Sequence, residues 1–222
     1  MIDEMIELTA KLRSALGTEA ETLFARQIDR ARESGVEEHA LRTGDTAPEF
    51  RLPDASGTLV ESSRLLEHGP IVLIFYRGGW CRYCNIQLRA FQKHLSEIRA
   101  LGGQLVAISP ETPDNTMTTR EREALEFFVL SDSGNSVARA FGLTFELAVE
   151  ADAILKRSGR DVASHNASDR AELPVPTTYV IGKAGIIAFA MSNVDYRTRV
   201  TPEKVIGVLT RLSGEQETYY GG

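Results

Sequence analysis

Ile71-Val-Leu-Ile-Phe-Tyr-Arg-Gly-Gly-Trp-Cys-Arg-Tyr-Cys-Asn-Ile86 carries an apolar run directly into a pair of cysteines. Residues 72–76 are uncharged and mostly β-branched or aromatic, which is typical of a strand buried on both faces. Gly78 and Gly79 then allow a tight turn, and from about Tyr83 apolar residues recur at helical spacing. The pattern therefore predicts that the cysteines lie where a buried strand passes into a helix.

This position suits redox chemistry at the two thiols. The first turn of a helix presents unpaired N–H groups and a partial positive charge, and both favour thiolate over thiol. The thiolate is the nucleophilic form of cysteine. Cys81 and Cys84 are close enough along one turn to form a disulfide after one sulfur has been attacked. They are the only two cysteines of the chain, so any intramolecular disulfide joins them.

A metal site and an inert core are the two other roles that we considered for this pair. A structural zinc site takes four ligands, and the chain has neither a second cysteine pair nor ligand spacing among His39, His68, His94 and His165. Free cysteines are often simply buried. The strand-to-helix position favours the redox reading, and we expect no metal and no bound cofactor.

Composition limits the broad class of protein. With 222 residues, of which 42% are hydrophobic, the chain can bury one substantial core. Its net charge of -6 and its lack of a basic run argue against nucleic-acid binding. The acidic start has no signal-peptide features, and no stretch approaches the roughly 20 apolar residues of a membrane span. We expect a cytoplasmic protein without a membrane partner, where a lone cysteine pair is more often catalytic than structural.

Residues 1–41 are expected to form a helical arm made of two helices. Gly17 suits the end of the first helix, and Thr18 with Glu21 forms a capping-box pattern that starts the second. Such an arm can pack on its own domain or on a second subunit, which would make a homodimer through the N-terminal helices. The sequence leaves both arrangements open.

The strand at 72–76, its helix and a second buried strand at 104–109 predict a right-handed βαβ unit. Ligands of α/β folds usually bind at the carboxyl edge of the strands, which is where the cysteines lie. On the following loop, Glu111 or Thr112 either approaches the thiols or belongs to a solvated turn, and we favour the turn.

Further elements are expected along the second half of the chain. They are a helix at 115–125, a strand at 127–130, a short helix at 136–141, a hairpin of 177–181 with 186–190, and a last helix that starts at Thr201. Residues 142–173 are expected to be an irregular insertion that overhangs the cysteines. Residues 214–222 are expected to be a flexible tail.

Two known signatures overlap in the segment 75–84. Its Trp-Cys-x-x-Cys part resembles the active site of thioredoxins, in which the first cysteine, here Cys81, attacks. In another register the segment is similar to Phe-Tyr-Pro-x-x-x-Thr-x-x-Cys of the peroxiredoxins, the AhpC/TSA family. There Cys84 takes the place of the peroxidatic cysteine, Cys81 that of the threonine and Arg77 that of the proline.

Other segments extend the resemblance to peroxiredoxins. Residues 44–54 are similar to the opening of that family, and residues 130–138 resemble its later strand, turn and helix. The chain most closely resembles a peroxiredoxin-like subgroup with a Gly-Gly-Trp-Cys-x-Tyr-Cys motif. The resemblance implies an α/β, thioredoxin-like fold over residues 42–213, with a central mixed β-sheet flanked by helices.

The resemblance also implies an activity, that of an oxidoreductase which reduces hydroperoxides as a thiol-dependent peroxidase. One thiolate, Cys84 in the peroxiredoxin register, becomes a sulfenic acid, and Cys81 condenses with it to a disulfide. Thioredoxin or a small thiol then restores the dithiol. Because the two registers disagree, the sequence leaves open which cysteine attacks.

Departures from the family identify the expected supporting residues. The family's arginine before a late strand is replaced by Pro176, and Pro176-Thr177 resembles the cis-proline loop that lies against the cysteines in thioredoxins. Arg197 or Arg199 either replaces the missing arginine or is merely solvated, and we favour solvation.

Near the cysteines, Gln87 stands where the family has a glutamate, which keeps the hydrogen bonding without the charge. Trp80 and Arg77 complete the expected support. Arg82, between the cysteines, is expected to lower a thiol pKa.

Two other functions fit the same motif. The first is a thioredoxin-like thiol-disulfide oxidoreductase that acts on protein disulfides, with Cys81 as the nucleophile. The second is a non-catalytic redox-sensing module whose disulfide changes a partner-binding surface. Turnover of peroxide distinguishes the peroxidase from both.

Overall fold

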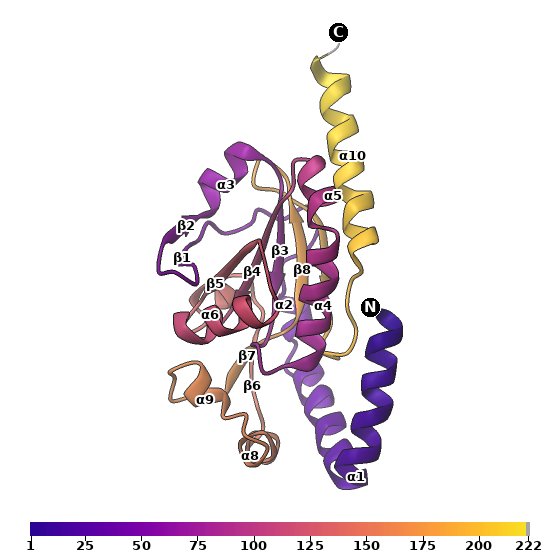
Figure 1. Cartoon of the computed structure of the whole chain (residues 1–222), viewed down its shortest axis with the longest axis vertical. Coiled ribbons are helices and arrows are strands. Elements are labelled where there is room, and N and C mark those ends of the chain that lie inside the picture. The colour runs from indigo at the N-terminus through magenta and orange to yellow at the C-terminus, as the bar shows by residue number, and fades with distance from the viewer. Residues whose placement is uncertain (221–222) are drawn as a thin grey trace.

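A five-stranded mixed sheet forms the centre of the molecule, with the spatial order β5-β4-β3-β8-β9 (Figure 1). The structure, a computed structural model, describes residues 1–220 except for the side chains at positions 16, 19 and 215–220. Two short antiparallel pairs, β1 with β2 and β6 with β7, lie outside this sheet. The strands are β1 (Arg51–Pro53), β2 (Leu59–Glu61), β3 (Ile71–Phe75), β4 (Gln104–Ser109), β5 (Phe128–Ser131), β6 (Thr144–Glu146), β7 (Glu172–Pro174), β8 (Thr177–Ile181) and β9 (Ile187–Ser192).

Helices cover both faces of the sheet and extend beyond its ends. β3 runs parallel to β4, and β4 runs parallel to β5, whereas β8 and β9 are antiparallel to their neighbours. The helices are α1 (Ile2–Glu33), α2 (Val36–His39), α3 (Ser62–His68), α4 (Arg82–Lys93), α5 (Leu95–Ala100), α6 (Pro113–Arg122), α7 (Ser136–Ala140), α8 (Val149–Arg157), α9 (Val162–His165) and α10 (Pro202–Tyr220).

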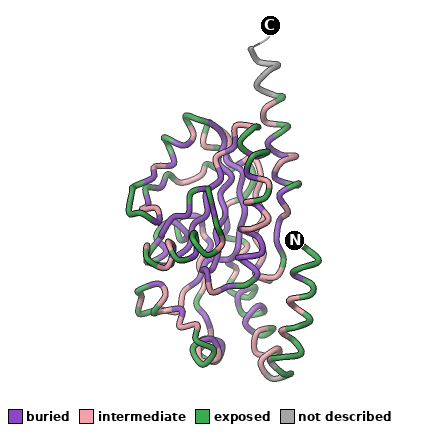
Figure 2. The backbone as a smooth tube through the Cα atoms, viewed as in Figure 1, coloured by how far each residue is buried: buried purple, intermediate pink, exposed green. Residues whose placement is uncertain are grey.

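The central strand β3 is buried along its whole length, as the sequence predicts, and its residues alternate between two hydrophobic cores. Val72 and Ile74 belong to the core that α4, α5 and α10 cover. Leu73 and Phe75 belong to the core under α3 and α7. Figure 2 shows the buried strands surrounded by more exposed helices. The structure thus confirms the α/β fold with a central mixed sheet flanked by helices.

The arm α1 is two helical segments joined at a kink. Gly17 has φ 76° and ψ 165°, outside the helical region, so the break that the sequence predicts at this glycine is confirmed. In Figure 1 the two segments fold back beside each other, and Arg13 pairs with Glu21 across the kink at 2.6 Å.

The arm packs on its own domain. The Thr9 and Tyr83 hydroxyls lie 2.8 Å apart, and Arg89 of α4 pairs with Glu4 at 2.7 Å. Within the described range of the chain, no helix is long and apolar enough to cross a membrane.

Two elements differ from the sequence-based expectations, and β1 was not predicted at all. The helix after the cysteines is interrupted at His94, which separates α4 from α5. β1 ends at Pro53, which pairs with Leu59 of β2. α10 continues to Tyr220, because the segment after Ser213 contains no proline and is rich in Glu and Gln, which favour helix. Of the expected tail, only 221–222 lie outside the described residues.

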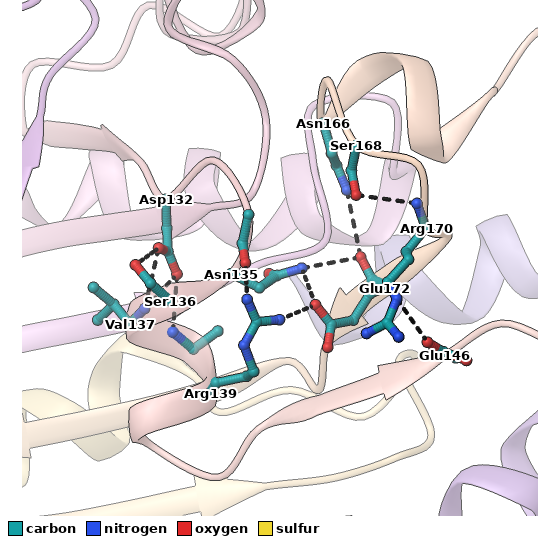
Figure 3. A network of polar contacts seen from close by, with 12 residues as sticks. Asp132, Asn135, Ser136, Val137, Arg139, Glu146, Asn166, Ser168, Arg170 and Glu172 are labelled. Carbon is teal, nitrogen blue, oxygen red and sulfur yellow. Dashed lines mark hydrogen bonds and ion pairs between the residues drawn. The ribbon is translucent and has the colours of Figure 1, made fainter.

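The insertion 142–173 is regular where we expected irregular structure, since it contains β6, α8, α9 and β7. Figure 3 shows the polar contacts that hold it to the core. The Glu172 carboxylate accepts hydrogen bonds from Arg139 and, at 3.1 Å, from the Asn135 amide. The Asn166 amide donates to the Glu172 carbonyl at 3.4 Å. The insertion is therefore a fixed part of the molecule.

Candidate active site

Both cysteines lie at the amino end of α4. Cys81 occupies the N-cap position with an extended backbone, φ -86° and ψ 106°, and Cys84 lies in the first turn. Both are free thiols. The preceding turn requires a glycine at position 78, where φ is +138° and a Cβ would lie 2.5 Å from Nε1 of Trp80. The local sequence thus places both sulfurs at the amino end of α4, which carries a partial positive charge.

Three side chains hold the peptide groups of Gly79, just before Cys81. The Gly79 N–H donates to Oε2 of Glu111 at 2.8 Å. The Gly79 carbonyl accepts from Nδ2 of Asn85 at 2.8 Å and from a guanidinium nitrogen of Arg122 at 2.6 Å. A Cβ on Gly79 would lie 1.8 Å from Oγ1 of Thr119, so no larger residue fits. These contacts fix the loop that presents Cys81.

The two thiols have opposite pKa shifts. The S–H of Cys84 donates to the Cys81 sulfur, and this hydrogen bond, together with the charges of Arg77 and Arg199, lowers the pKa of Cys81 to about 5 although burial opposes the shift. Complete burial and the adjacent Cys81 thiolate raise the pKa of Cys84. In the reduced protein the thiolate is therefore on Cys81 and the remaining proton is on Cys84.

Arg199 reaches the cysteines from the segment after β9. One of its guanidinium nitrogens lies 3.5 Å from Sγ of Cys84, and another donates to Oε1 of Gln87 at 3.4 Å. Gln87 donates in turn to Oγ1 of Thr178 at 3.3 Å. Arg199 is only 6% exposed, so the expectation that it is merely solvated is wrong. The sulfur nearest to Arg199 is that of Cys84, the protonated thiol. The charge of Arg199 lowers the pKa of Cys84, but burial and the Cys81 thiolate raise it more, so Cys81 still ionises first.

Arg77 lies between two aromatic rings beside Cys81. Its guanidinium carbon is 4.5 Å from the centroid of the Tyr196 ring and 5.0 Å from that of Trp80. Cation–π contact of this kind stabilises a desolvated arginine. The Tyr196 ring also packs edge-on against Tyr83, with 5.5 Å between the centroids.

Pro176 and Thr177 are placed differently from a cis-proline loop. The peptide bonds around Pro176 are trans, as are all others in the described chain, so the cis geometry suggested by the thioredoxin resemblance is wrong here. The Val175 N–H donates to the Leu143 carbonyl at 2.7 Å, which keeps this segment extended between β7 and β8.

Pro176 lines a small recess together with Gln87 and Arg199. The Thr177 hydroxyl bonds to the Val175 carbonyl and to Ser192, each at 3.0 Å. Among the contacts of the described residues, Thr177 has none with either cysteine.

Glu111 is buried, contrary to our preference for a solvated turn. It is 2% exposed, and burial raises its pKa to about 7 although the Gly79 N–H and Arg122 favour the carboxylate. His165 of the insertion lies 3.7 Å from its other oxygen. Thr112, the alternative candidate, caps α6 by accepting the Asn115 N–H at 3.5 Å.

Tyr196, Thr178, Arg122 and Asn85 were missed by sequence reasoning. The first three come from elements distant in sequence from the cysteines, and no local pattern singles out Asn85, which follows Cys84 directly. For Thr178 alone the sequence contains a weak signal. Side chains along a strand alternate between the two faces of the sheet, which predicts which residues of β8 lie on the same face.

A groove of about 450 Å³ opens beside Cys81. Arg77, Trp80 and Tyr83 line it together with Cys81 and with residues of α1 and α8. Cys84 is fully buried and is not among the lining residues. A small molecule that enters the groove therefore meets Cys81 first.

A sheet of this topology with a Cys-x-x-Cys pair at the amino end of α4 defines a thiol protein of the thioredoxin-like fold. Comparison with known sequences assigns the chain to a family within this fold. The sequence model of the AhpC/TSA family matches residues 43–190, which are 148 of the 222 residues. The chain belongs to the AhpC/TSA family.

Known relatives agree with this membership. The chain is 26% identical to chloroplastic peroxiredoxin Q of Triticum aestivum over 183 residues, which are 82% of this chain and 71% of that protein. It is 32% identical to peroxiredoxin Bcp of Escherichia coli over 104 residues, 46% of this chain and 65% of that protein.

Solved structures show the same fold. Peroxidoxin BcpB from Mycobacterium tuberculosis superposes with a TM-score of 0.62 at 24% identity, covering 78% of this chain and 98% of that one. The arm α1 and the helix α10 lie outside the part matched by the family model.

Proposed function

We propose that the chain is a thiol-dependent peroxidase, an oxidoreductase that reduces hydroperoxides through a Cys81/Cys84 dithiol-disulfide cycle. The observation that carries the proposal is the hydrogen-bonded cysteine pair at the end of α4, with a low-pKa Cys81 in the groove. Membership of the AhpC/TSA family, whose relatives are named peroxiredoxins, supports it.

In the first step the Cys81 thiolate attacks the terminal oxygen of the hydroperoxide. The O–O bond breaks, Cys81 becomes a sulfenic acid, and the leaving alkoxide takes the proton of Cys84 to become an alcohol, or water when the substrate is hydrogen peroxide. This assigns the attack to Cys81, the thioredoxin register, because Cys81 is the ionised and groove-lining thiol.

In the second step Cys84, now a thiolate, attacks the Cys81 sulfur. The S–O bond breaks, hydroxide leaves and takes a proton from solvent, and the Cys81–Cys84 disulfide forms. Arg199, 3.5 Å from the Cys84 sulfur, stabilises the thiolate that this step needs. Gln87 orients Arg199, and Pro176 closes the recess beside them. Arg77 and Trp80 line the groove beside Cys81. Thr177 stabilises only the pairing of β8 with β9, through its hydrogen bond to Ser192.

Recycling takes two electrons and two protons from a thioredoxin-type protein or from two molecules of a small thiol. We also propose a cytoplasmic location, since reducing partners of this kind maintain dithiols there. A homodimer through the exposed side of α1, where Ile2 and Ile6 lie, stays a separate proposal.

A thioredoxin-like oxidoreductase that acts on protein disulfides is the second candidate. The low pKa of Cys81 favours it, because a thiolate at the first cysteine of Cys-x-x-Cys also attacks disulfides. The groove walls oppose it, since Cys81 is only 4% exposed. Reduction of insulin disulfides without peroxide turnover would support this candidate. Stoichiometric oxidation without turnover would instead support a redox-sensing module.

The decisive experiment is stopped-flow oxidation by hydrogen peroxide, followed through the fluorescence of Trp80, the only tryptophan. Wild type and Cys84→Ser are expected to react much faster than free cysteine, and Cys81→Ser is expected to react no faster. The opposite ranking of the variants would move the attack to Cys84 and leave the peroxidase intact. If every form reacts as slowly as free cysteine, the peroxidase proposal falls.

A further inference from the structure

Glu111 is a buried acid beside the active-site loop that the proposed cycle does not use. It follows β4 closely, it is 2% exposed, and its Oε2 accepts the Gly79 N–H at 2.8 Å. A Cβ on Gly78 would lie 3.1 Å from its carboxyl carbon. The carboxyl group therefore packs directly against the loop that presents Cys81, in a place where an unpaired charge is costly.

Four other charged or titratable groups face this carboxyl, each from a different element. The Cys81 thiolate and Arg122 of α6 act on it through their charges. Burial and the charge of Glu111 raise the pKa of Tyr76, which directly follows β3, so Tyr76 stays a neutral phenol. The imidazole of His165 in α9 is only partly buried, with 30% of its side chain exposed. Glu111 is thus the buried group of this set that can exchange a proton near neutral pH.

The negative charges of Glu111 and Cys81 oppose each other. Burial raises the pKa of Glu111 to about 7, and the Cys81 thiolate adds to the rise, whereas the Gly79 N–H and Arg122 act against it. The thiolate exists only in the reduced protein, because its sulfur becomes part of an uncharged bond when the disulfide forms. Disulfide formation must therefore lower the pKa of Glu111 and favour release of its proton.

The insertion places a second proton acceptor next to Glu111. The backbone carbonyl of His165 accepts the Thr112 N–H at 3.2 Å and the Asn115 amide at 3.0 Å, which fastens α9 to the segment that carries Glu111. Nδ1 of His165 then lies 3.7 Å from Oε1 of Glu111. Because an imidazole both accepts and donates protons near neutral pH, this partly exposed ring connects the buried carboxyl to solvent.

We infer that Glu111 is a redox-linked proton site, which holds a proton while Cys81 is a thiolate and releases it when the Cys81–Cys84 disulfide forms. The inference rests on the proposed dithiol-disulfide cycle and adds a positioning residue to it. Glu111 acts on the sulfurs through its charge and through the Gly79 N–H, and the substrate does not touch it.

The proton balance of the cycle changes accordingly. The hydroxide that leaves in the second step takes one proton from solvent, and the proton that Glu111 releases offsets this uptake. The thiolate, the thiol, the carboxylic acid and the hydroperoxide thus give the disulfide, the carboxylate, an alcohol and water. Reduction by two electrons returns one proton to Cys84 and one to Glu111.

Counting protons tests this inference. Reduced full-length protein is mixed with one equivalent of hydrogen peroxide in weakly buffered solution, and a pH indicator reports the protons taken up per disulfide formed. Cys81 is a thiolate both at about pH 8 and at about pH 6.5. At the higher pH, where Glu111 is largely ionised in both states, uptake should be close to one proton. At the lower pH, wild type should take up only about half a proton.

Variants assign the missing half proton. Glu111→Gln keeps an acceptor for the Gly79 N–H but cannot ionise, so it should take up one proton per disulfide at both pH values. Glu126→Gln, which removes an exposed acid, is the matched control and should behave like wild type. A purely structural role of Glu111 would change stability or rate and leave this count unchanged. The same count in Glu111→Gln and wild type would overturn the inference.

A second measurement needs no variant that folds. At about pH 6.5, the infrared difference spectrum between oxidised and reduced wild type should show the loss of a protonated carboxyl band and the gain of a carboxylate band. A spectrum without this pair of bands, or an uptake of one proton by wild type at both pH values, would overturn the inference.

Failure of the peroxidase proposal can be told apart from failure of this inference. Oxidised dithiothreitol forms the same disulfide with the same proton count. If it gives the half-proton release but peroxide does not oxidise the thiols, the peroxidase proposal falls and the proton site of Glu111 stands. If peroxide oxidises Cys81 rapidly but the count is one proton at both pH values, the peroxidase stands and the proton site falls.

Discussion

One proton lies between the sulfurs of Cys81 and Cys84, and its position decides which of the two thiols is ionised. The Cys84 S–H stabilises the Cys81 thiolate, while burial keeps Cys84 protonated. Arg77 and Arg199 add positive charge from two sides. An unpaired buried charge is costly, so the ionised form of Cys81 depends mainly on the hydrogen bond from Cys84.

Removing that hydrogen bond should change the reactivity of Cys81. In wild type, alkylation of Cys81 by iodoacetamide should rise through a pKa of about 5 and then level off. Cys84→Ala has no donor, so the pKa of Cys81 should move up toward that of an ordinary cysteine. Cys84→Ser keeps a donor and is the control, in which the shift should be much smaller. Identical pH profiles for Cys84→Ala and wild type would contradict this account.

Glu111 should give stability a recognisable pH dependence. Its pKa is raised to about 7 from an ordinary 4.5, so the folded state keeps a proton that the unfolded chain has released. The contribution of Glu111 to stability is therefore complete below the unfolded pKa and is lost as pH rises through about 7. Glu111→Gln keeps an acceptor for the Gly79 N–H and cannot ionise.

Urea unfolding between pH 5 and pH 8 tests this. The free energy of unfolding of Glu111→Gln should gain on that of wild type as pH rises. The exposed Glu126→Gln is the control, and its difference from wild type should stay constant. A constant difference for Glu111→Gln as well would show that this carboxyl is already ionised at pH 5.

At the scale of elements, two helices depend on glycine in opposite ways. The loop before α4 passes so close to α6 that a Cβ on Gly79 would overlap the Thr119 side chain at 1.8 Å. Gly207 lies within α10, and a Cβ there would meet nothing within 4 Å. The first glycine is required by packing, whereas the second only weakens its helix.

Replacing each glycine by alanine should therefore have opposite effects. Gly79→Ala should destabilise the protein by about 1–3 kcal/mol, because the tightly held loop must shift. Gly207→Ala should stabilise it by about 0.5–1 kcal/mol, as expected for glycine in a helix interior. Urea denaturation of both variants measures the two changes. A destabilised Gly207→Ala would mean that α10 needs its glycine for a contact absent here.

Elements with a strong local signal could be predicted from the sequence, and the others could not. β4 occupies the predicted range 104–109, and β3 differs from its prediction by one residue at each end, because continuous apolar runs between glycines leave little freedom. The break at His94 and the regular insertion have no such signal. β6 and β7 have three residues each, and they pair with each other although α8 and α9 lie between them in the sequence.

The candidate site divides in the same way. The cysteine motif can be recognised from the local sequence. Arg199, in contrast, contacts Cys84 from 115 positions away, and only the folded structure shows which arginine lies beside the cysteines. Glu111 looked like a loop residue because its burial comes from α6 and from the active-site loop. The resemblance to a cis-proline loop failed, since the peptide bond before Pro176 is trans and the Val175 N–H bonds to the Leu143 carbonyl.

At the scale of the whole molecule, the arm and the insertion depend on each other. Gln27 of α1 is 7% exposed and satisfies the Ala148 N–H, which begins α8. Arg30 and Glu150 add only an exposed pair at 3.9 Å, which contributes little. The join between the two walls of the groove therefore rests on one amide side chain and on apolar packing.

Gln27→Ala should weaken this join. The variant leaves the half-buried Ala148 N–H without this partner and removes a buried side chain, and the free energy of unfolding should fall by about 1–3 kcal/mol. The neighbouring Arg26→Ala, which is exposed, should change it by less than about 0.5 kcal/mol. Chemical denaturation gives both values, and hydrogen exchange should show faster exchange in α8 of Gln27→Ala alone. Equal exchange in the two variants would mean that apolar packing suffices.

The position of α1 at the beginning of the chain has a consequence for synthesis on the ribosome. The arm is translated before the rest of the described domain: Thr9 lies 74 residues before its partner Tyr83, and Gln27 lies 121 residues before Ala148. The arm can therefore pack only after α4, and then the start of α8, have been translated. Because distant contacts are slow to form, we expect the walls that α1 and α8 build beside Cys81 to be completed late in folding.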